Sequence, residues 1–274
     1  MDASPDTRGP PRKARKRRRW KLLDRWRGRL RAAGRRLSTV PSALRIVVVA
    51  AVVLALLVVA NLIYHVAHKP TEMLFPISGR LNKAPADTWR EYGPLFGEYS
   101  TATITPELLA ALAQIESAGN PVARTYWRWR LTWNPLAIYA PASSAVGMYQ
   151  MTDPAFAEAR RYCIRRHAVV PDGCWFTSLY TRVLPRHAVE LTAIYLDRGV
   201  AAVLAGLPGV AATSQQKQDL AALIHLCGAG PARAFARRGF RPQAGERCGD
   251  HSVAAYLGKV NAMKREFSRL AADR

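Results

Sequence analysis

The apolar residues of this chain fall into one long uninterrupted run, followed by many short runs at helical spacing. Residues 46–66 form the long run, which contains no Asp, Glu, Lys or Arg and is about as long as a bilayer-spanning helix. From residue 104 onward, apolar residues recur three and four positions apart, which predicts amphipathic helices around a shared core. The pattern therefore predicts a single transmembrane helix followed by an all-α globular domain.

The helices predicted beyond residue 104 begin and end at recognisable capping residues. In the first, over residues 106–118, Thr105 suits the N-cap, Pro106 the first helical position and Gly119 the end. Further helices are predicted over residues 153–167, 186–198, 200–206, 214–227, 231–238 and 252–271. Residues 67–103, with scattered Pro and Gly, are interpreted as a linker, which leaves 104–274 as the globular domain.

One segment departs from the helical pattern, because residues 125–133 alternate aromatic side chains with basic or polar ones. This period of two predicts a small hairpin or an extended loop. The segment contains three tryptophans, Trp127, Trp129 and Trp133. These indoles either pack together as a small side core or form a platform on which a ligand such as a sugar ring stacks.

The net charge of +22 is unevenly distributed. Residues 1–45 hold 16 Lys or Arg and 3 Asp or Glu, a net +13, with too few large apolar residues for a core, so this segment is expected to be largely disordered. Basic residues before the apolar run predict a cytoplasmic N-terminus, which places the main domain outside the cytoplasm. A cleaved signal peptide is the alternative, but the polar lead is long and no clear Ala-x-Ala site follows.

The basic segment also allows an alternative of nucleic-acid binding. Because it lies next to a predicted membrane span, it is more simply explained as a topology signal that contacts anionic lipid. We therefore expect the membrane as a partner and no nucleic acid.

All four cysteines lie beyond the apolar run, and an even number in an exported domain predicts two disulfides. Three pairings are possible, and the two that close short loops, Cys163–Cys174 and Cys227–Cys248, are favoured. His225 near Cys227 is a weak zinc pattern, and no CxxC spacing is present. No metal or other cofactor is expected.

The candidate catalytic residue is Glu116, near the end of the helix predicted over 106–118. Leu109, Leu112 and Ala113 precede it by seven, four and three positions, so Glu116 lies on the apolar side of its own helix. Desolvation and the negative end of the helix dipole both disfavour an ionised carboxyl there, which suits a general acid. The alternative is an ordinary solvated surface glutamate.

Three motifs follow one another in order: Glu116-Ser117, Asn134-Pro135-Leu136-Ala137 and Gly147-Met148-Tyr149-Gln150. With Ala229-Gly230-Pro231 and Tyr256, they resemble the catalytic core of the soluble lytic transglycosylase (SLT) family over about residues 104–265. The family pattern is Glu-Ser, Asn-Pro-x-Ala, a Gly-Leu-Met-Gln-like turn, and Ala-Gly-Pro after Ala-Tyr-Asn. The resemblance implies a lysozyme-like helical fold, with a small extended or hairpin insertion in this chain.

This chain departs from the family pattern at three places. The aromatic segment 120–133 is inserted between the first two motifs, and Cys227-Gly228 replaces the family's Tyr-Asn. Met148 and Tyr149 stand where the family usually has Leu and Met. These changes put the detailed sugar contacts of this wall in doubt.

The resemblance implies cleavage of the β-1,4 bond between N-acetylmuramic acid and N-acetylglucosamine in peptidoglycan, with Glu116 acting first as acid and then as base to form a 1,6-anhydro ring. Substrate-binding roles are implied for Ser117, Gly147, Met148, Tyr149, Gln150 and Tyr256. Spacing alone cannot pair Asp153, Glu158 or Glu190 with Glu116 as the second carboxylate of a typical glycosidase.

The expected protein is a single-pass enzyme of a bacterial cytoplasmic membrane whose catalytic domain meets glycan strands in the periplasm. A lysozyme-type hydrolase uses the same acid with water. A weakly active glycan-binding module of an envelope-spanning complex is the alternative from another class, and such a complex is a further candidate partner.

Overall fold

The computed structural model describes residues 41–69, 73 and 78–273. The tail predicted to be disordered, residues 1–45, lies outside the described residues except for its last five. The chain forms two compact units, which divide between Ile63 and Tyr64.

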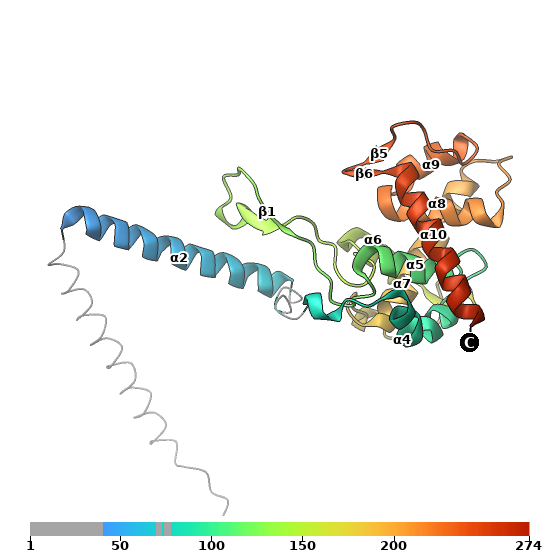
Figure 1. Cartoon of the computed structure of the whole chain (residues 1–274), viewed down its shortest axis with the longest axis horizontal. Helices are drawn as coiled ribbons and strands as arrows, with labels where there is room; N and C mark the ends of the chain where they lie inside the picture. Colours follow the sequence, from blue (N-terminus) through green and yellow to red (C-terminus); the bar gives the residue numbers. More distant parts are fainter. Residues whose placement is uncertain (1–40, 70–72, 74–77, 274) are drawn as a thin grey trace, which may run out of the picture. The chain divides into compact units, whose positions relative to one another are not determined.

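The first described element is the helix α2 (Ser42–His68), drawn in blue in Figure 1. Its 27 residues rise about 40 Å, more than the roughly 30 Å of a bilayer's hydrocarbon core. None of its residues is buried, although nearly all are apolar. The helix is long and apolar enough to cross a membrane, in agreement with the predicted span over residues 46–66.

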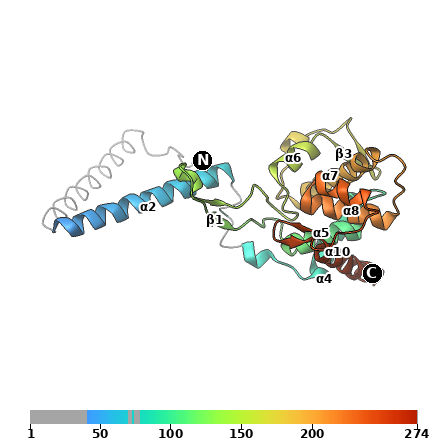
Figure 2. The same ribbon diagram turned by 90° about the horizontal axis from the view of Figure 1, so that it is seen from above.

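The second unit is mostly helical (Figures 1 and 2). Its α-helices are α4 (Pro85–Glu98), α5 (Pro106–Ser117), α6 (Asp153–Ala159), α7 (Pro185–Ala205), α8 (Ser214–Cys227), α9 (Ala229–Arg237) and α10 (Val253–Ala272). Short 3₁₀ turns lie at Gly79–Leu81, Pro135–Ala137 and Thr177–Leu179.

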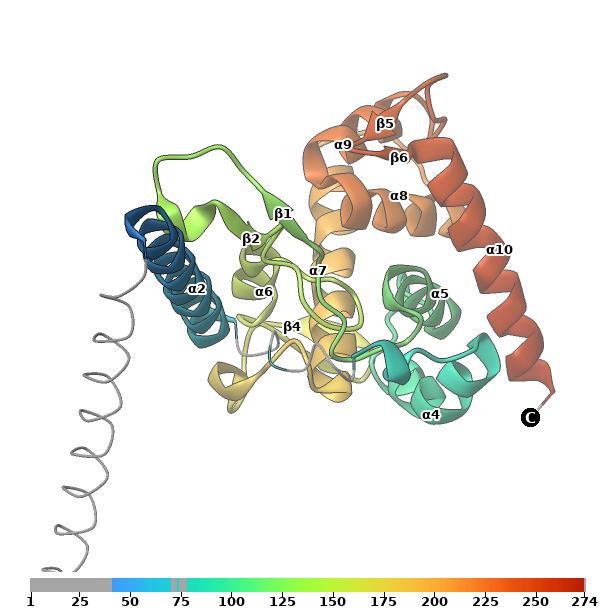
Figure 3. The same cartoon turned by 60° about the vertical axis from the view of Figure 1, so that its left-hand side comes forward.

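Helix α5 lies at the centre of this unit and packs against α4, α7 and α10 (Figure 3). All six residues from Leu108 to Ala113 are completely buried. Its start is as predicted, because the Thr105 side chain accepts a hydrogen bond from the Leu108 amide. It ends at Ser117, one residue before the predicted 118, and both Ala118 and Gly119 have positive φ, of +51° and +66°. One turn beyond the buried stretch, the helix presents Glu116.

Three antiparallel hairpins accompany the helices. Strands β1 (Trp127–Trp129) and β2 (Tyr139–Pro141) pair with Trp129 opposite Tyr139, which confirms the hairpin predicted from the aromatic alternation. The other two are β3 (Cys163–Arg165) with β4 (Ala168–Val170), and β5 (Arg247–Cys248) with β6 (His251–Ser252).

The prediction of a linker over residues 67–103 is wrong for the second half of this range. Residues 85–98 form α4, whose Trp89, Tyr92 and Phe96 belong to the main core. The aromatic residues recur at three- and four-residue spacing, so one face of α4 is apolar despite the internal Pro94 and the flanking glycines. Residues 70–72 and 74–77 of the predicted linker lie outside the described residues.

Two predicted helix boundaries also differ. The helix predicted over 153–167 ends at Ala159. The rest of that range belongs to the β3–β4 hairpin, which turns at Arg166 and His167, both with positive φ. The helices predicted over 186–198 and 200–206 are one continuous α7. Gly199 does not end α7 but lies inside it, where a Cβ would come within 3.2 Å of Ile224 on α8, so glycine permits the close packing of α7 on α8.

The structure pairs Cys163 with Cys174 and Cys227 with Cys248, which is the pairing that the sequence favoured. The first bond closes the β3–β4 hairpin onto the following loop. The second ties the end of α8 to β5, the first strand of the hairpin that precedes α10. Because Cys227 is bonded to Cys248, it offers no thiolate to a zinc ion, and the described residues contain no cluster of three or more potential metal ligands.

Removing the disulfides is expected to lower the thermal stability of the folded unit. Each bond closes a short loop, 11 and 21 residues in sequence separation, which corresponds to roughly 3 kcal/mol of stabilisation per bond and a melting temperature lower by about 6–12 °C. The measurement is differential scanning fluorimetry of the detergent-solubilised full chain, as wild type and as the paired variants Cys163→Ser/Cys174→Ser and Cys227→Ser/Cys248→Ser. Melting temperatures equal to that of the wild type would contradict the expectation.

Candidate active site

Three helices converge on the carboxyl group of Glu116, the next-to-last residue of α5. The Tyr256 hydroxyl, from the first turn of α10, donates a 2.7 Å hydrogen bond to Glu116 Oε1. His225 Nε2, from the last turn of α8, lies 3.6 Å from the same oxygen. The Glu116 side chain is 20% exposed, so it is largely enclosed and still open to solvent on one side.

Tyr256 is a permanent hydrogen-bond donor to this carboxyl group. Burial, the negative charge of Glu116 and the hydrogen bond itself raise the pKa of the Tyr256 hydroxyl well above its ordinary value. The phenol therefore keeps its proton at any physiological pH and fixes Oε1. Among the described residues, no side chain or amide donates a hydrogen bond to Oε2, which leaves this oxygen to meet an incoming group.

His225 was considered only as part of a weak zinc pattern, with no metal expected, and its place beside Glu116 was not foreseen from the sequence. Its side chain is 11% exposed. A protonated imidazole at 3.6 Å stabilises a carboxylate, whereas a neutral one does so far less. The sequence motif nearest to His225 is Ala229-Gly230-Pro231, which begins four residues after it, just past the end of α8.

Ser117 connects the end of α5 to the turn at Gly147–Gln150. Its Oγ lies 2.7 Å from the Met148 carbonyl oxygen and 3.2 Å from that of Ala113, to either of which its hydroxyl can donate. The resemblance implied a substrate-binding role for Ser117, which stays a prediction; in the structure its hydroxyl bonds to backbone carbonyls. Two motifs that are thirty residues apart in the sequence are thus held together.

Gln150 closes the same turn through its amide nitrogen, which donates to the carbonyl oxygens of Ala123 and Gly147 at 3.1 and 2.9 Å. Both amide hydrogens are therefore used inside the protein. The Gln150 Oε1 atom accepts no hydrogen bond from any described residue, so it is the atom that remains for a ligand.

Met148 and Tyr149 lie inside the core, with 0% and 1% of their surfaces exposed. Their side chains support the turn from within, and their contact with a sugar stays a prediction. The Tyr149 hydroxyl is buried without a hydrogen-bond partner among the described residues, and burial raises its pKa.

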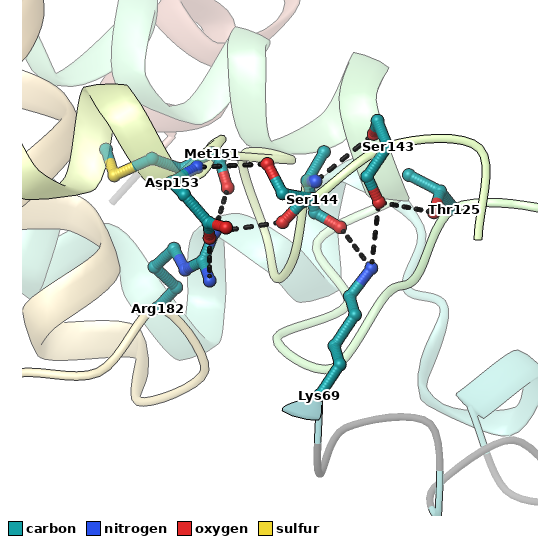
Figure 4. Close-up of polar contacts among 8 residues, drawn as sticks. Lys69, Thr125, Ser143, Ser144, Met151, Asp153 and Arg182 are labelled. Carbon is teal, nitrogen blue, oxygen red and sulfur yellow. Dashed lines mark hydrogen bonds and ion pairs between the residues drawn. The ribbon is translucent and has the colours of Figure 1, made fainter. Parts of the chain in front are cut away.

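The segment that carries the turn is held at both ends by Arg182, a residue that the sequence analysis did not single out (Figure 4). Its Nη1 donates to the carbonyl oxygens of Ser144 and Met151 at 2.9 and 2.8 Å, and its Nη2 lies 2.6 Å from Asp153 Oδ1. Because a single guanidinium joins the two ends, residues 144–151 form a closed loop of fixed shape.

Gly147 is required by this clamp. Its φ is +83°, and a Cβ at this position would lie 2.1 Å from the Arg182 carbonyl oxygen. The resemblance implied a substrate-binding role for Gly147, but the group that comes close to it here is the backbone of Arg182. Asn134, from the Asn-Pro-Leu-Ala motif, accepts from the Leu136 amide at 3.0 Å and is exposed in the loop between β1 and β2.

Comparisons with protein-family profiles, with curated proteins and with solved structures found no match to this chain. The function is therefore argued below from the residues of this chain and their geometry.

Replacing Gly147 with alanine is expected to destabilise the fold by about 2 kcal/mol or more, because it adds a backbone clash to the strain of a positive φ. The matched control is Gly209→Ala, where φ is +87° and a Cβ meets no atom within 4 Å, so that only the strain is added. Thermal melts of both variants measure the difference. Equal losses would mean that the contact with Arg182 is not tight.

Proposed function

We propose that this protein is a membrane-anchored lytic transglycosylase that cleaves the peptidoglycan bond between N-acetylmuramic acid and N-acetylglucosamine. The observation that carries the proposal is the environment of Glu116, an enclosed carboxyl group with one oxygen fixed by Tyr256 and the other open. It is supported by the Ser117–Met148 bond, which brings together two of the motifs that resemble the SLT family. The lysozyme-like fold belongs to the same proposal.

Glu116 serves as the acid and then as the base in the proposed reaction. Its carboxylic proton goes to the glycosidic oxygen as the bond from that oxygen to C1 breaks, and the leaving sugar departs as an alcohol. The substrate's own acetamido oxygen carries the positive charge that develops at C1. The Glu116 carboxylate then accepts the proton of the C6 hydroxyl as O6 bonds to C1, which closes the 1,6-anhydro ring and restores the acid.

A single carboxylate is enough for this sequence of steps, and the other carboxylates named from the sequence are placed accordingly. Asp153 forms an ion pair with Arg182. Glu190 is 3% exposed and accepts hydrogen bonds from the Tyr180 hydroxyl and the Ile164 amide. Glu158 lies on the exposed side of α6. The engagement of Asp153 and Glu190 elsewhere favours a mechanism without a second carboxylate.

Tyr256 and His225 act on the proposed reaction through Glu116. The Tyr256 bond orients the carboxyl group so that Oε2 faces the substrate. His225, when protonated, stabilises the carboxylate that exists between the two proton transfers. Both are positioning residues, since neither is placed against the reacting atoms.

The proposed location is a bacterial cytoplasmic membrane, crossed once by α2, with the N-terminus in the cytoplasm and the catalytic unit outside. The apolar length of α2 and the basic residues before it support this orientation. The two disulfides support an oxidising compartment for the folded unit.

Glu116→Gln is expected to lower product release at least about a hundredfold, because the amide has no proton to give and cannot accept one. The full chain is incubated with purified peptidoglycan, and the soluble products are measured by mass spectrometry. Glu107→Gln, in the first turn of the same helix, is the matched control and should retain activity. Products with 1,6-anhydro ends support the proposal, whereas products heavier by one water would identify a hydrolase, and normal release by a folded Glu116→Gln would exclude Glu116.

Tyr256→Phe is expected to lower kcat about tenfold to a hundredfold, with little change in KM, since it removes one hydrogen bond to a charged group and no substrate contact. The control is Tyr195→Phe on α7, where the hydroxyl has no hydrogen bond among the described residues. Initial rates at several peptidoglycan concentrations separate the two constants. A rise in KM alone would place Tyr256 against the substrate instead.

A further inference from the structure

The hairpin β1–β2 exposes large apolar side chains that the proposed reaction does not use. Figures 1 and 2 show β1 and its loop extending away from the helices of the same unit. At the tip, Leu131 and Trp133 are fully exposed, at 108% and 103%. Exposed apolar residues along the rest of the hairpin are Tyr126, Trp129, Ile138 and Tyr139. A group of this kind marks a surface that meets another apolar phase.

The hairpin is attached to two residues at the end of the α2 segment, His65 within α2 and Lys69 directly after it. Within the second unit, His65 Nε2 donates to the Leu136 carbonyl oxygen at 2.8 Å, and the rings of His65 and Trp127 meet edge to face at 5.1 Å. Lys69 Nζ donates to the carbonyl oxygens of Ser143 and Ala145 just beyond β2 (Figure 4). Within the second unit, the base of the hairpin is therefore held to His65 and Lys69.

The charges of this region suit an anionic surface. Residues 117–152 contain three arginines and no Asp or Glu. Arg128 and Arg130 are exposed and alternate with the tryptophans of β1. Aromatic rings flanked by arginine are typical of protein segments at the level of lipid headgroups, where the rings lie among the glycerol groups and the guanidinium groups meet phosphates.

The side chains at the tip favour lipid over a sugar as the occupant. Trp129 stacks on one face of Tyr139 with centroids 4.6 Å apart but stays 74% exposed, and Trp127 lies against Tyr139 and His65. The side chains left fully open are one indole and one leucine at the tip. A branched aliphatic side chain gains much from burial in hydrocarbon and offers no flat face for stacking on a sugar.

We propose that the hairpin tip, residues 130–138, is a second membrane contact that inserts into the lipid interface at the His68 end of α2. Leu131 and Trp133 enter the upper acyl region, and Arg128 and Arg130 bind lipid phosphates. This inference rests on the proposed membrane anchorage by α2 and is independent of the chemistry at Glu116. Its consequence is that the catalytic unit is held to the membrane surface at two points and works on glycan close to the lipid.

The test places an environment-sensitive fluorophore on the full chain through Leu131→Cys, since the native cysteines are disulfide-bonded and do not react without reductant. The chain is reconstituted in vesicles of phosphatidylcholine and phosphatidylglycerol, and flotation reports whether it is membrane-bound. Ala262→Cys, exposed on α10, is the matched control site. We expect the Leu131 label to show blue-shifted emission, quenching by lipid that carries a headgroup-proximal nitroxide, and protection from aqueous iodide. The Ala262 label should show the reverse.

Two further variants test the proposed contributions. Trp133→Ser in the Leu131→Cys background should reduce the quenching by nitroxide lipid, and Arg128→Gln/Arg130→Gln should reduce it only in vesicles that contain phosphatidylglycerol. Both changes are at exposed positions, so flotation and thermal melts should be unchanged.

The outcomes separate this inference from the anchor on which it rests. A chain that floats while its Leu131 label is quenched by iodide and not by nitroxide lipid retains the anchor and overturns the hairpin contact. Protection from iodide only after peptidoglycan fragments are added would assign the hairpin to glycan and also overturn it. A chain that does not float overturns both. Product release from peptidoglycan, measured in parallel, reports on Glu116 alone.

Discussion

The folded unit depends on the complete burial of one helix. Residues 108–113 of α5 have no exposed surface, because α4, α7 and α10 pack around them. Burying the leucine side chains contributes about 1.5–3 kcal/mol each, and a helix enclosed in this way cannot shift along its axis without opening the core. The position of Glu116, one turn beyond the buried stretch, is therefore set by packing and not by contacts of its own side chain.

This rigidity explains how a small number of polar contacts can organise the site. The core fixes the end of α5, and Tyr256 and His225 are supplied by α10 and α8, which belong to the same core. The turn at Gly147–Gln150 buries Met148 and Tyr149 in the same core, is hydrogen-bonded to Ser117 and Ala123, and is flanked by Ser144 and Met151, which both accept from Arg182. Apolar packing thus positions the carboxyl group, and a polar clamp positions the loop that faces it.

The sequence predicted the parts of the fold that follow from local rules. The length of the apolar run predicted the span of α2, and the capping residue Thr105 predicted the start of α5. The alternation of aromatic residues predicted the β1–β2 hairpin. Helix α4 was missed because Pro94 and the flanking glycines concealed an aromatic stripe, and the break predicted at Gly199 was wrong because its glycine serves a contact with α8. Neither helix α4 nor the continuity of α7 through Gly199 can be predicted without knowing which helices pack against each other.

The same distinction applies to the candidate site. Glu116, Ser117 and Gln150 could be singled out as candidates because their motifs are compact in the sequence. His225 and Arg182 were not, since their importance comes from contacts with residues 109 and 31–38 positions away, and nothing in their local sequence indicates such a contact. The role expected for Gly147 changed for the same reason, because its close neighbour is a carbonyl 35 positions further along the chain.

The Cys227–Cys248 bond determines when the two helices beside Glu116 become covalently linked. It joins the last residue of α8, two positions after His225, to β5, the first strand of the hairpin that precedes the helix of Tyr256. The covalent link thus bridges the two helices that flank Glu116. Thiols stay reduced in a bacterial cytoplasm and are oxidised outside it. If the chain has the proposed function and location, Glu116 would lie between two unlinked helices until export, and oxidation would then be a maturation step that delays full activity until the protein has left the cytoplasm.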